Sequence, residues 1–165
     1  MQSDRSLQRC GKWDRRFFAV CDLVASWSED VERGVGCVIV GDAFEVRATG
    51  YNGLPRGVTH SVERLQRDGG ERFLWIEHAE RNALFNAARA GVSVAKCTLY
   101  SNCFPCAHCA RAIIQSGIMA VKTIYFPPND PMFAREDLRT TAMLSEAGVT
   151  LAFYDWTSAV TRDSI

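Results

Sequence analysis

The spacing of hydrophobic positions predicts a helix and then a hairpin in the first third of the chain. Residues 13–28 carry apolar side chains three and four positions apart, which places them on one face of a helix. These positions are Trp13, Phe17, Val20, Cys21 and Val24. Two short runs rich in β-branched residues follow at 35–41 and 44–50, and the Gly41-Asp42 pair between them is typical of a tight turn. The two runs therefore predict a β-hairpin.

Helical and strand patterns alternate in the second half of the chain. A polar, glycine-rich connection at 51–74 comes first, and connections of this length in compact domains tend to be functional or mobile. The elements expected after it are helix 77–91, strand 97–101, helix 105–117, strand 122–126, helix 134–148 and strand 149–155. Gly91 and Gly117 mark helix ends, and Pro105 is expected at the first helical position. This alternation predicts parallel crossover units in a three-layer α-β-α fold with a mixed five-stranded sheet.

Composition narrows the class of protein. The chain has 165 residues, of which 47% are hydrophobic and 23% charged, so we expect a single domain over 1–165 with its core at about 12–155. The sequence has neither a long apolar run nor the apolar middle of a signal peptide, and we expect a cytoplasmic protein without membrane contact. A net charge of zero argues against a long nucleic acid as partner and favours a small-molecule substrate.

The segment "FPCAHC" at 104–109 contains the first candidate chemistry. Cys106 and Cys109 lie at i and i+3 on one face of the predicted helix 105–117, in its first turn. There the helix dipole and unpaired amide groups favour the thiolate form that binds metal. The spacing alone fits three uses: a redox dithiol, part of a structural zinc site, or part of a catalytic metal site.

A second segment, "EHAE" at 77–80, favours the catalytic alternative. One histidine, His78, and the two cysteines make three zinc ligands, which leaves a fourth position open for water, as in catalytic zinc sites. Glu80 is well placed to receive a proton from that water. The combination H-x-E and P-C-x-x-C is typical of zinc deaminases acting on cytosine or adenine groups. We therefore expect one catalytic Zn²⁺ per chain, held by His78, Cys106 and Cys109.

The neighbouring residues fit the other two uses poorly. A thioredoxin-like site would place the cysteine pair after the first strand, and a structural four-cysteine site would need a second close pair among the seven cysteines. His108 stands between the two cysteines in the sequence, and successive residues lie about 100° apart around a helix. Its side chain should therefore point away from the face that carries both cysteines, and so away from the metal. We expect packing or solvent contact for His108 and His60, and a packing role at the strand end for Cys103.

Several segments together resemble the deoxycytidylate (dCMP) deaminase family, within the cytidine deaminase-like fold. They are "KWDRRFFAVCDLVASWSED" (12–30), "VGCVIV" (35–40), "GYNGLPRGV" (50–58), "EHAERNAL" (77–84), "FPCAHCARAIIQSGI" (104–118) and "AGVTL" (147–151). The resemblance implies hydrolysis of a cytosine nucleotide, with dCMP converted to dUMP and ammonia. A zinc-activated water would attack C4 of the ring, while Glu80 moves the proton to N3 and then to the leaving amine.

The resemblance also implies further contacts. Asn52 is a candidate sugar or base contact, or alternatively a left-handed turn residue before Gly53. Arg56 could meet a phosphate or be an exposed loop arginine, and Asn82 could orient loop backbone or the nucleotide. In the family the segment matching 50–53 also serves a regulatory triphosphate site. Relatives form dimers or hexamers, so we expect a homo-oligomer.

Two segments differ from the family pattern and keep other functions open. Residues 28–37 read "SEDVERGVGC", with Val31 where the family has proline and Gly34 where it has glutamine. Residues 127–137 lack the family's tyrosine-bearing segment. The alternatives are the same chemistry on a nucleoside, a base or an aminopurine, a polynucleotide-editing deaminase, and a non-catalytic zinc protein. Neutral charge argues against the polynucleotide-editing deaminase, and the presence of Glu80 argues against the non-catalytic zinc protein.

Overall fold

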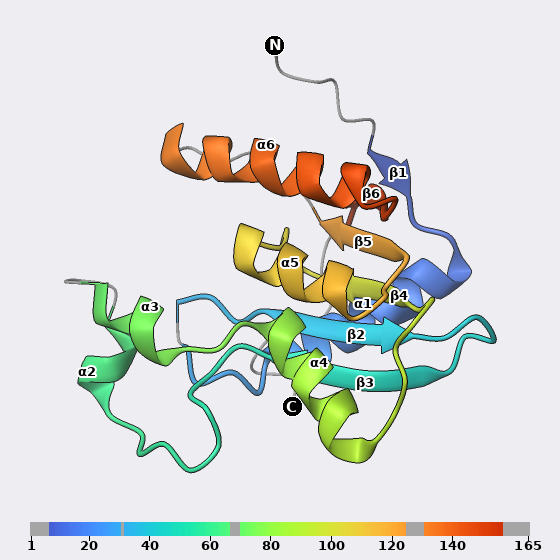
Figure 1. The fold of residues 1–165 in the computed structure, drawn as a ribbon. Coiled ribbons are helices and arrows are strands. Elements are labelled where there is room, and N and C mark those ends of the chain that lie inside the picture. Colours follow the sequence, from blue (N-terminus) through green and yellow to red (C-terminus); the bar gives the residue numbers. More distant parts are fainter. Residues whose placement is uncertain (1–6, 31, 67–69, 125–130, 157–165) are drawn as a thin grey trace.

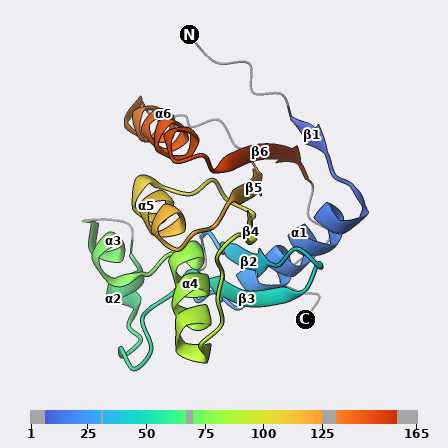
Figure 2. The same cartoon turned by 45° about the vertical axis from the view of Figure 1, so that its right-hand side comes forward.

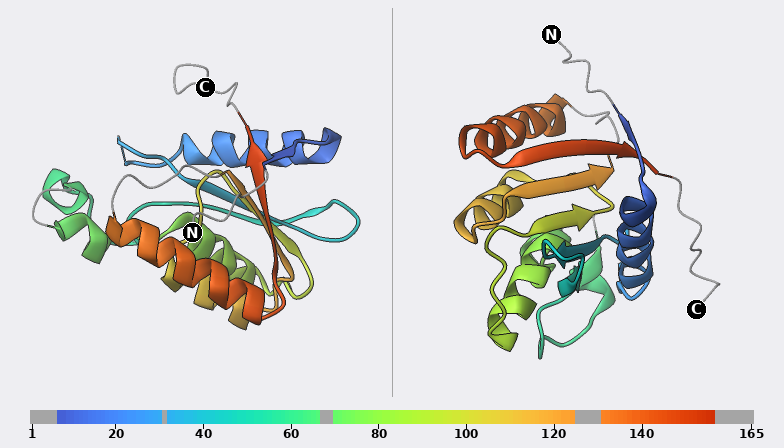
Figure 3. Two further views of the ribbon diagram at one scale, coloured as in Figure 1. Left: turned by 90° about the horizontal axis from the view of Figure 1, so that it is seen from above. Right: turned by 90° about the vertical axis from the view of Figure 1, so that its right-hand side faces the viewer.

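A sheet lies between two layers of helices. A computed structural model of the chain describes residues 7–30, 32–66, 70–124 and 131–156. Seen from above, helix α1 (Lys12–Ala25) covers one face of the sheet (Figure 3, left). Three helices cover the other face: α4 (Ala79–Ala90), α5 (Ala107–Gln115) and α6 (Pro131–Glu146) (Figures 1 and 2). The predicted three-layer α/β architecture is confirmed.

Six strands form one mixed sheet in the order β1-β6-β5-β4-β2-β3. In chain order the strands are β1 (Gln8–Arg9), β2 (Gly36–Val40), β3 (Val46–Tyr51), β4 (Thr98–Ser101), β5 (Ala120–Ile124) and β6 (Thr150–Asp155). Antiparallel pairing joins β3 to β2 and β2 to β4, which confirms the hairpin. Strands β4, β5, β6 and β1 run parallel to one another. The carboxyl ends of the parallel strands therefore meet at one edge, where open α/β sheets place their sites.

The prediction of five strands is wrong, because β1 adds a sixth at the edge of the sheet. Gln8 pairs with Tyr154 and Arg9 with Asp155, in parallel with β6. Both β1 side chains are exposed, so no apolar alternation marks the strand in the sequence. Backbone pairing alone forms this strand. Strand β5 also starts two residues before the expected position, and residues 125–126 of its predicted range lie outside the described residues.

Two apolar cores, one on each face, hold the layers together. Strand β2 contributes to both, because successive side chains of a strand point to opposite faces. On the α1 face the core contains Phe17, Phe18, Cys21, Val38, Val40 and Tyr100. On the face of α4 and α5 it contains Cys37, Ile39, Ala83, Leu99, Ala110 and Ile113. Of the predicted stripe on α1, Trp13 is partly exposed and stacks on Phe44 across the hairpin turn.

The predicted connection at 51–74 contains two short helices, α2 (Val62–Leu65) and α3 (Glu71–Trp75). The second contributes Arg72, which is buried and forms an ion pair with buried Asp30 in the segment that follows α1. This pair ties the long connection, whose helices α2 and α3 lie at the left of Figure 1, to the segment that follows α1. Among the helices in the described ranges, none has both the length and the apolar character to cross a bilayer.

Close packing between β3 and α4 depends on Gly50. A methyl group at this position would overlap backbone atoms of Ala79 and Ala83 in α4. Helix backbone cannot move away as a flexible side chain would, so the helix start next to His78 would have to shift. The absence of a side chain at residue 50 thus sets the distance between the sheet and the first turn of α4.

We expect Gly50→Ala to lower the free energy of unfolding by about 1–3 kcal/mol, the usual cost of overpacking a core. The measurement is urea unfolding followed by circular dichroism. Gly53→Ala is the matched control, since a methyl group there would make only an ordinary contact of 3.8 Å with the Tyr51 ring. Equal stability of the two variants would contradict this account of Gly50.

Candidate metal centre

His78 and Cys106 occupy equivalent positions at the starts of two neighbouring helices. His78 is the N-cap residue of α4 and Cys106 is the N-cap residue of α5, each with extended backbone dihedrals. Cys109 lies in the first turn of α5. The predicted helices 77–91 and 105–117 place His78 and Cys106 inside their first turns. In the structure each residue stands just before the first helical residue, at the N-cap. Pro105 likewise precedes the N-cap and is not the first helical residue.

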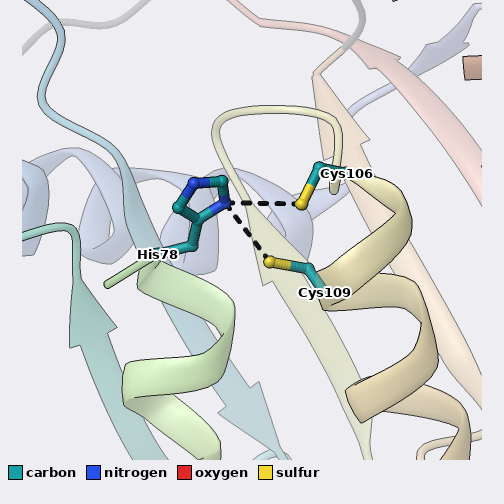
Figure 4. A group of neighbouring side chains, drawn as sticks. All are labelled: His78, Cys106 and Cys109. Carbon is teal, nitrogen blue, oxygen red and sulfur yellow. Dashed lines mark hydrogen bonds between the residues drawn. The ribbon is translucent and has the colours of Figure 1, made fainter. Parts of the chain in front are cut away.

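The three predicted ligands converge (Figure 4). His78 Nδ1 lies 3.5 Å from Cys106 Sγ and 3.5 Å from Cys109 Sγ. All three donor atoms lie within 4.8 Å of one another. A tetrahedral zinc with Zn–S bonds of about 2.3 Å and a Zn–N bond of about 2.0–2.1 Å separates its nitrogen and sulfur ligands by about 3.6 Å. The nitrogen–sulfur distances and the donor types therefore fit one zinc ion with an open fourth position.

The electrostatics of the two thiols favour a metal-binding form. The pKa of Cys106 falls to about 3, chiefly because the Cys109 thiol donates a hydrogen bond to it and also because of His78. The pKa of Cys109 rises, because it shares its proton with Cys106 and is buried close to Glu80. The pKa of His78 is raised, chiefly by its hydrogen bond with Cys106. The cluster thus already carries one negative sulfur, and a bound cation would favour loss of the remaining shared proton.

Glu80 is buried next to the ligands, only 3% exposed. Its Oε2 lies 3.5 Å from Cys109 Sγ. Burial is the main cause of the raised pKa of this carboxyl group. A carboxyl group with a raised pKa exchanges a proton near neutral pH more readily than an exposed one. The position and environment of Glu80 suit a general acid–base residue.

Backbone and side-chain contacts hold the start of α4 in place. Glu77 Oε1 accepts hydrogen bonds from the His78 amide at 2.8 Å and from Arg81 Nε at 2.6 Å. Residues Gly53 and Glu77 form an isolated antiparallel bridge, with hydrogen bonds of 3.1 and 2.9 Å. The segment just after β3 is therefore fixed to the residue that precedes His78. Sequence reasoning missed Glu77, although it stands directly before the recognised His-Ala-Glu.

Glu136 holds the start of α5 in a similar way. Its Oε1 accepts a hydrogen bond from the backbone amide of Ala107 at 3.1 Å, so α6 caps the helix that carries both cysteines. Glu136 lies nearly thirty residues from this amide in the chain, and no motif connects them. Residues that orient metal ligands in this way commonly affect metal affinity.

Asn52 lies buried in a hydrogen-bond network with all of its amide hydrogens in use. Its Nδ2 donates to Asp30 Oδ2 at 3.1 Å and to the Arg33 carbonyl at 3.0 Å, while its Oδ1 accepts from the Val35 amide at 2.7 Å. Asn52 does not have a positive φ, so the alternative of a left-handed turn residue is wrong.

The other two candidate contact residues, Asn82 and Arg56, form hydrogen bonds that involve α4. Asn82 Nδ2 donates to the carbonyl of Tyr51, the last residue of β3, at 2.8 Å. Arg56 donates to Asn86 Oδ1 at 2.6 Å. Asn86 lies eight residues after His78 on α4, or about 12 Å along the helix axis. In this conformation the structure does not bring Arg56 to the metal ligands.

The residues expected to lie outside the ligand set do so. His108 is exposed and its Nδ1 lies 2.8 Å from Arg111, while His60 is exposed in the long connection. Cys103 is partly buried and contacts Arg33 Nη2 at 3.1 Å. Within the described residues, the group with metal-ligand geometry consists of His78, Cys106 and Cys109.

Comparisons with known proteins agree with this site. Residues 11–125 match the sequence profile of the cytidine and deoxycytidylate deaminase zinc-binding region. A protein of Aliivibrio fischeri, described as an uncharacterised deaminase in the luxG 3′ region, is 36% identical over 146 residues, which cover 86% of this chain and 93% of that protein. Human deoxycytidylate deaminase is 32% identical over 143 residues, covering 84% of this chain and 78% of its own length.

A solved structure confirms the fold. The dCMP deaminase of the cyanophage S-TIM5, in complex with dCMP and dUMP, matches with a TM-score of 0.70 and 22% sequence identity. The match covers 88% of this chain and 99% of that one. Fold, ligand geometry and profile agree over the same residues, and the chain therefore belongs to the zinc-dependent cytidine and deoxycytidylate deaminase family.

Proposed function

We propose that the protein hydrolyses the amino group of a cytosine nucleotide, with dCMP as substrate and dUMP and ammonia as products. One observation carries this proposal: three zinc ligands leave an open position, and buried Glu80 lies 3.5 Å from one of them, Cys109. The relatives named deoxycytidylate deaminase support dCMP as the substrate.

In the proposed mechanism the zinc ion, when bound, acidifies a water molecule so that it can attack C4 of the cytosine ring. Glu80 accepts the proton released by this water and delivers it to N3 of the ring. The same carboxyl group then carries the second proton of the water to the amino group. The new C4–O bond remains, the C4–N bond breaks, and nitrogen leaves as ammonia. Burial raises the pKa of the Glu80 carboxyl group, which helps it to hold the proton between the two transfers.

The proposed substrate contacts are Asn52, Asn82 and Arg56. Asn52 can accept one hydrogen bond from a sugar hydroxyl or base amino group while its internal network remains intact. Asn82 acts through the Tyr51 backbone that it orients. Arg56 would have to exchange its bond with Asn86 for a phosphate, at the substrate or at a regulatory triphosphate. Assembly into a dimer or hexamer remains a prediction of the family resemblance.

An ammonia-release screen with the zinc-loaded protein tests the proposed substrate. The panel contains cytosine and adenine bases, nucleosides and nucleotides, together with guanine compounds. We expect dCMP to give the highest kcat/KM. If dCMP is inert while another compound is deaminated, the zinc chemistry stands and dCMP as substrate is refuted. The variation in segments 28–37 and 127–137 is the reason to include purines.

A further inference from the structure

A short connection leads from the sheet to the metal ligand Cys106. Strand β4 ends at Ser101, and Cys106 is the N-cap residue of α5. The position of the Cys106 sulfur therefore depends on how the connection is held at its two ends. Glu136 holds the far end through the backbone amide of Ala107. Hydrogen bonds of Asn102, the first residue after β4, hold the near end.

The side chain of Asn102 completes the last pair between β4 and β2. The Asn102 amide donates to the Gly36 carbonyl at 3.2 Å, as in a regular antiparallel pair that continues the register of the two strands. In a regular pair the main-chain carbonyl would accept the returning bond. Here Asn102 Oδ1 accepts it, from the Gly36 amide at 2.9 Å. A side chain thus closes the ladder, which allows the main chain to turn away from the sheet toward the metal site.

Asp22 of α1 fixes the orientation of the Asn102 amide group. Asp22 Oδ1 accepts from Asn102 Nδ2 at 3.0 Å, and because a carboxylate only accepts, the Asn102 oxygen must face Gly36. The other carboxylate oxygen, Oδ2, accepts from Trp156 Nε1 at 2.8 Å. Trp156 follows β6 and stacks on Phe18 of α1, with ring centroids 6.0 Å apart. The chain just after β4 and the chain just after β6 are therefore bound to the same carboxylate.

The backbone behind these hydrogen bonds is closely packed. A methyl group on Gly36 would overlap the carbonyl of Cys21 in α1, so the start of β2 lies directly against the helix. Asp22 is the next residue of that helix. The hydrogen bonds of Asn102 thus attach the connection to two elements that are packed against each other. Rigid support of this kind keeps metal ligands in one geometry.

We infer that Asn102 is a positioning residue of the metal centre: with Asp22 and Trp156 it sets the course of residues 102–105 and thereby the place of the Cys106 sulfur. Asn102 acts through the connection and is not one of the converging donor atoms' residues. Loss of its hydrogen bonds should move Cys106 relative to the other two ligands and weaken zinc binding in a protein that remains folded. The inference rests on the metal centre of the proposed function and is independent of the substrate.

Zinc affinity of the full chain, measured by competition with a chelator, tests this inference. We expect Asn102→Ala to bind zinc about 10-fold more weakly than the wild type, the lower end of the usual effect for residues that orient metal ligands. The variant loaded with Co²⁺ should also show shifted visible absorption bands, because these bands depend on the geometry of the ligands around the ion.

Asp14→Asn is the matched control for a loss of stability alone. Asp14 also lies on α1 and also reaches the sheet, where it accepts hydrogen bonds from Tyr100 at 2.9 Å and Lys122 at 2.8 Å. It stands eight residues before Asp22, or about 12 Å along the helix. This variant should melt at a lower temperature than the wild type. Its zinc affinity should stay within about twofold of the wild type, because sites this far apart are usually independent.

An exchange of the two side chains separates hydrogen bonding from packing. Asn102→Asp alone places two carboxylates face to face and should weaken zinc binding. The double variant Asp22→Asn with Asn102→Asp puts the amide on α1 and the carboxylate on the connection. The Gly36 amide and the Trp156 indole then still meet oxygen acceptors, and the amide again donates to the carboxylate. Zinc affinity and the cobalt spectrum should return to those of the wild type.

Unchanged zinc affinity and an unchanged cobalt spectrum in Asn102→Ala, or in Asn102→Asp should the alanine variant not fold, would overturn the inference. An equal loss of zinc affinity in Asp14→Asn would do the same, as would failure of the double variant to recover. None of these measurements involves a nucleotide. A wild type that binds zinc but releases no ammonia from dCMP would therefore refute the proposed substrate and not the role of Asn102.

Discussion

Replacing Glu80 with glutamine should lower kcat by about 10²- to 10⁴-fold while the protein still binds zinc, because general acid–base groups contribute effects of this size. The amide has nearly the same shape as the carboxyl group and can occupy the same buried position. It cannot accept a proton from water or return one to the leaving amine. The three ligands His78, Cys106 and Cys109 are unchanged, so the metal should remain.

The test for Glu80 combines ammonia release with metal analysis of the same sample. Glu146→Gln is the matched control, since Glu146 is an exposed residue at the end of α6. A Glu80→Gln enzyme with wild-type turnover would refute the mechanism. Loss of zinc together with activity would instead assign Glu80 a role in holding the site.

Replacing Cys106 with alanine should remove both zinc and activity. A three-ligand site that loses one thiolate retains His78 and Cys109 only, and the sulfur that carries the negative charge of the cluster is gone. We expect zinc to fall from about one ion per chain to near zero. Turnover should fall by more than about 100-fold, the upper end for loss of a residue that merely orients a ligand.

Cys103→Ala provides a control from the same loop. Cys103 also lies near the centre, but its sulfur contacts Arg33 and is not among the converging donor atoms. This variant should retain its zinc, as measured by elemental analysis of freshly purified, reduced protein. Equal zinc content in the Cys106 and Cys103 variants would contradict the assignment of the ligands.

Much of the fold could be predicted from local patterns. The Gly41-Asp42 turn marks the hairpin, Gly91 adopts the left-handed conformation that ends α4, and the apolar runs of β2, β4 and β6 match strands. These signals are local, because turn chemistry and side-chain periodicity act over a few residues. Strand β1 was missed because two exposed polar residues carry no periodic signal.

The identity of the ligands also follows from sequence, because only a few residue types bind zinc and their spacing places them at helix starts. Their supporting residues do not follow from it. Glu136 reaches the start of α5 from α6, and Asp30 and Asn52 meet across two segments far apart in the chain. Contacts of this kind depend on packing between layers, and an isolated glutamate or asparagine looks like any surface residue.

The sequence by itself determined the reaction chemistry: His78, Glu80, Cys106 and Cys109 are short motifs whose residue types and order specify a zinc site with an adjacent proton carrier. Only the tertiary structure decided how the predicted contact residues lie relative to that site. Asn52 and Arg56 are both candidate substrate contacts in a linear chain, and both stand in the predicted connection 51–74. Folding fixes Arg56 against Asn86 and buries Asn52 against Asp30 and the Arg33 carbonyl. The difference arises from long-range hydrogen bonds, which exist only once the layers have packed together.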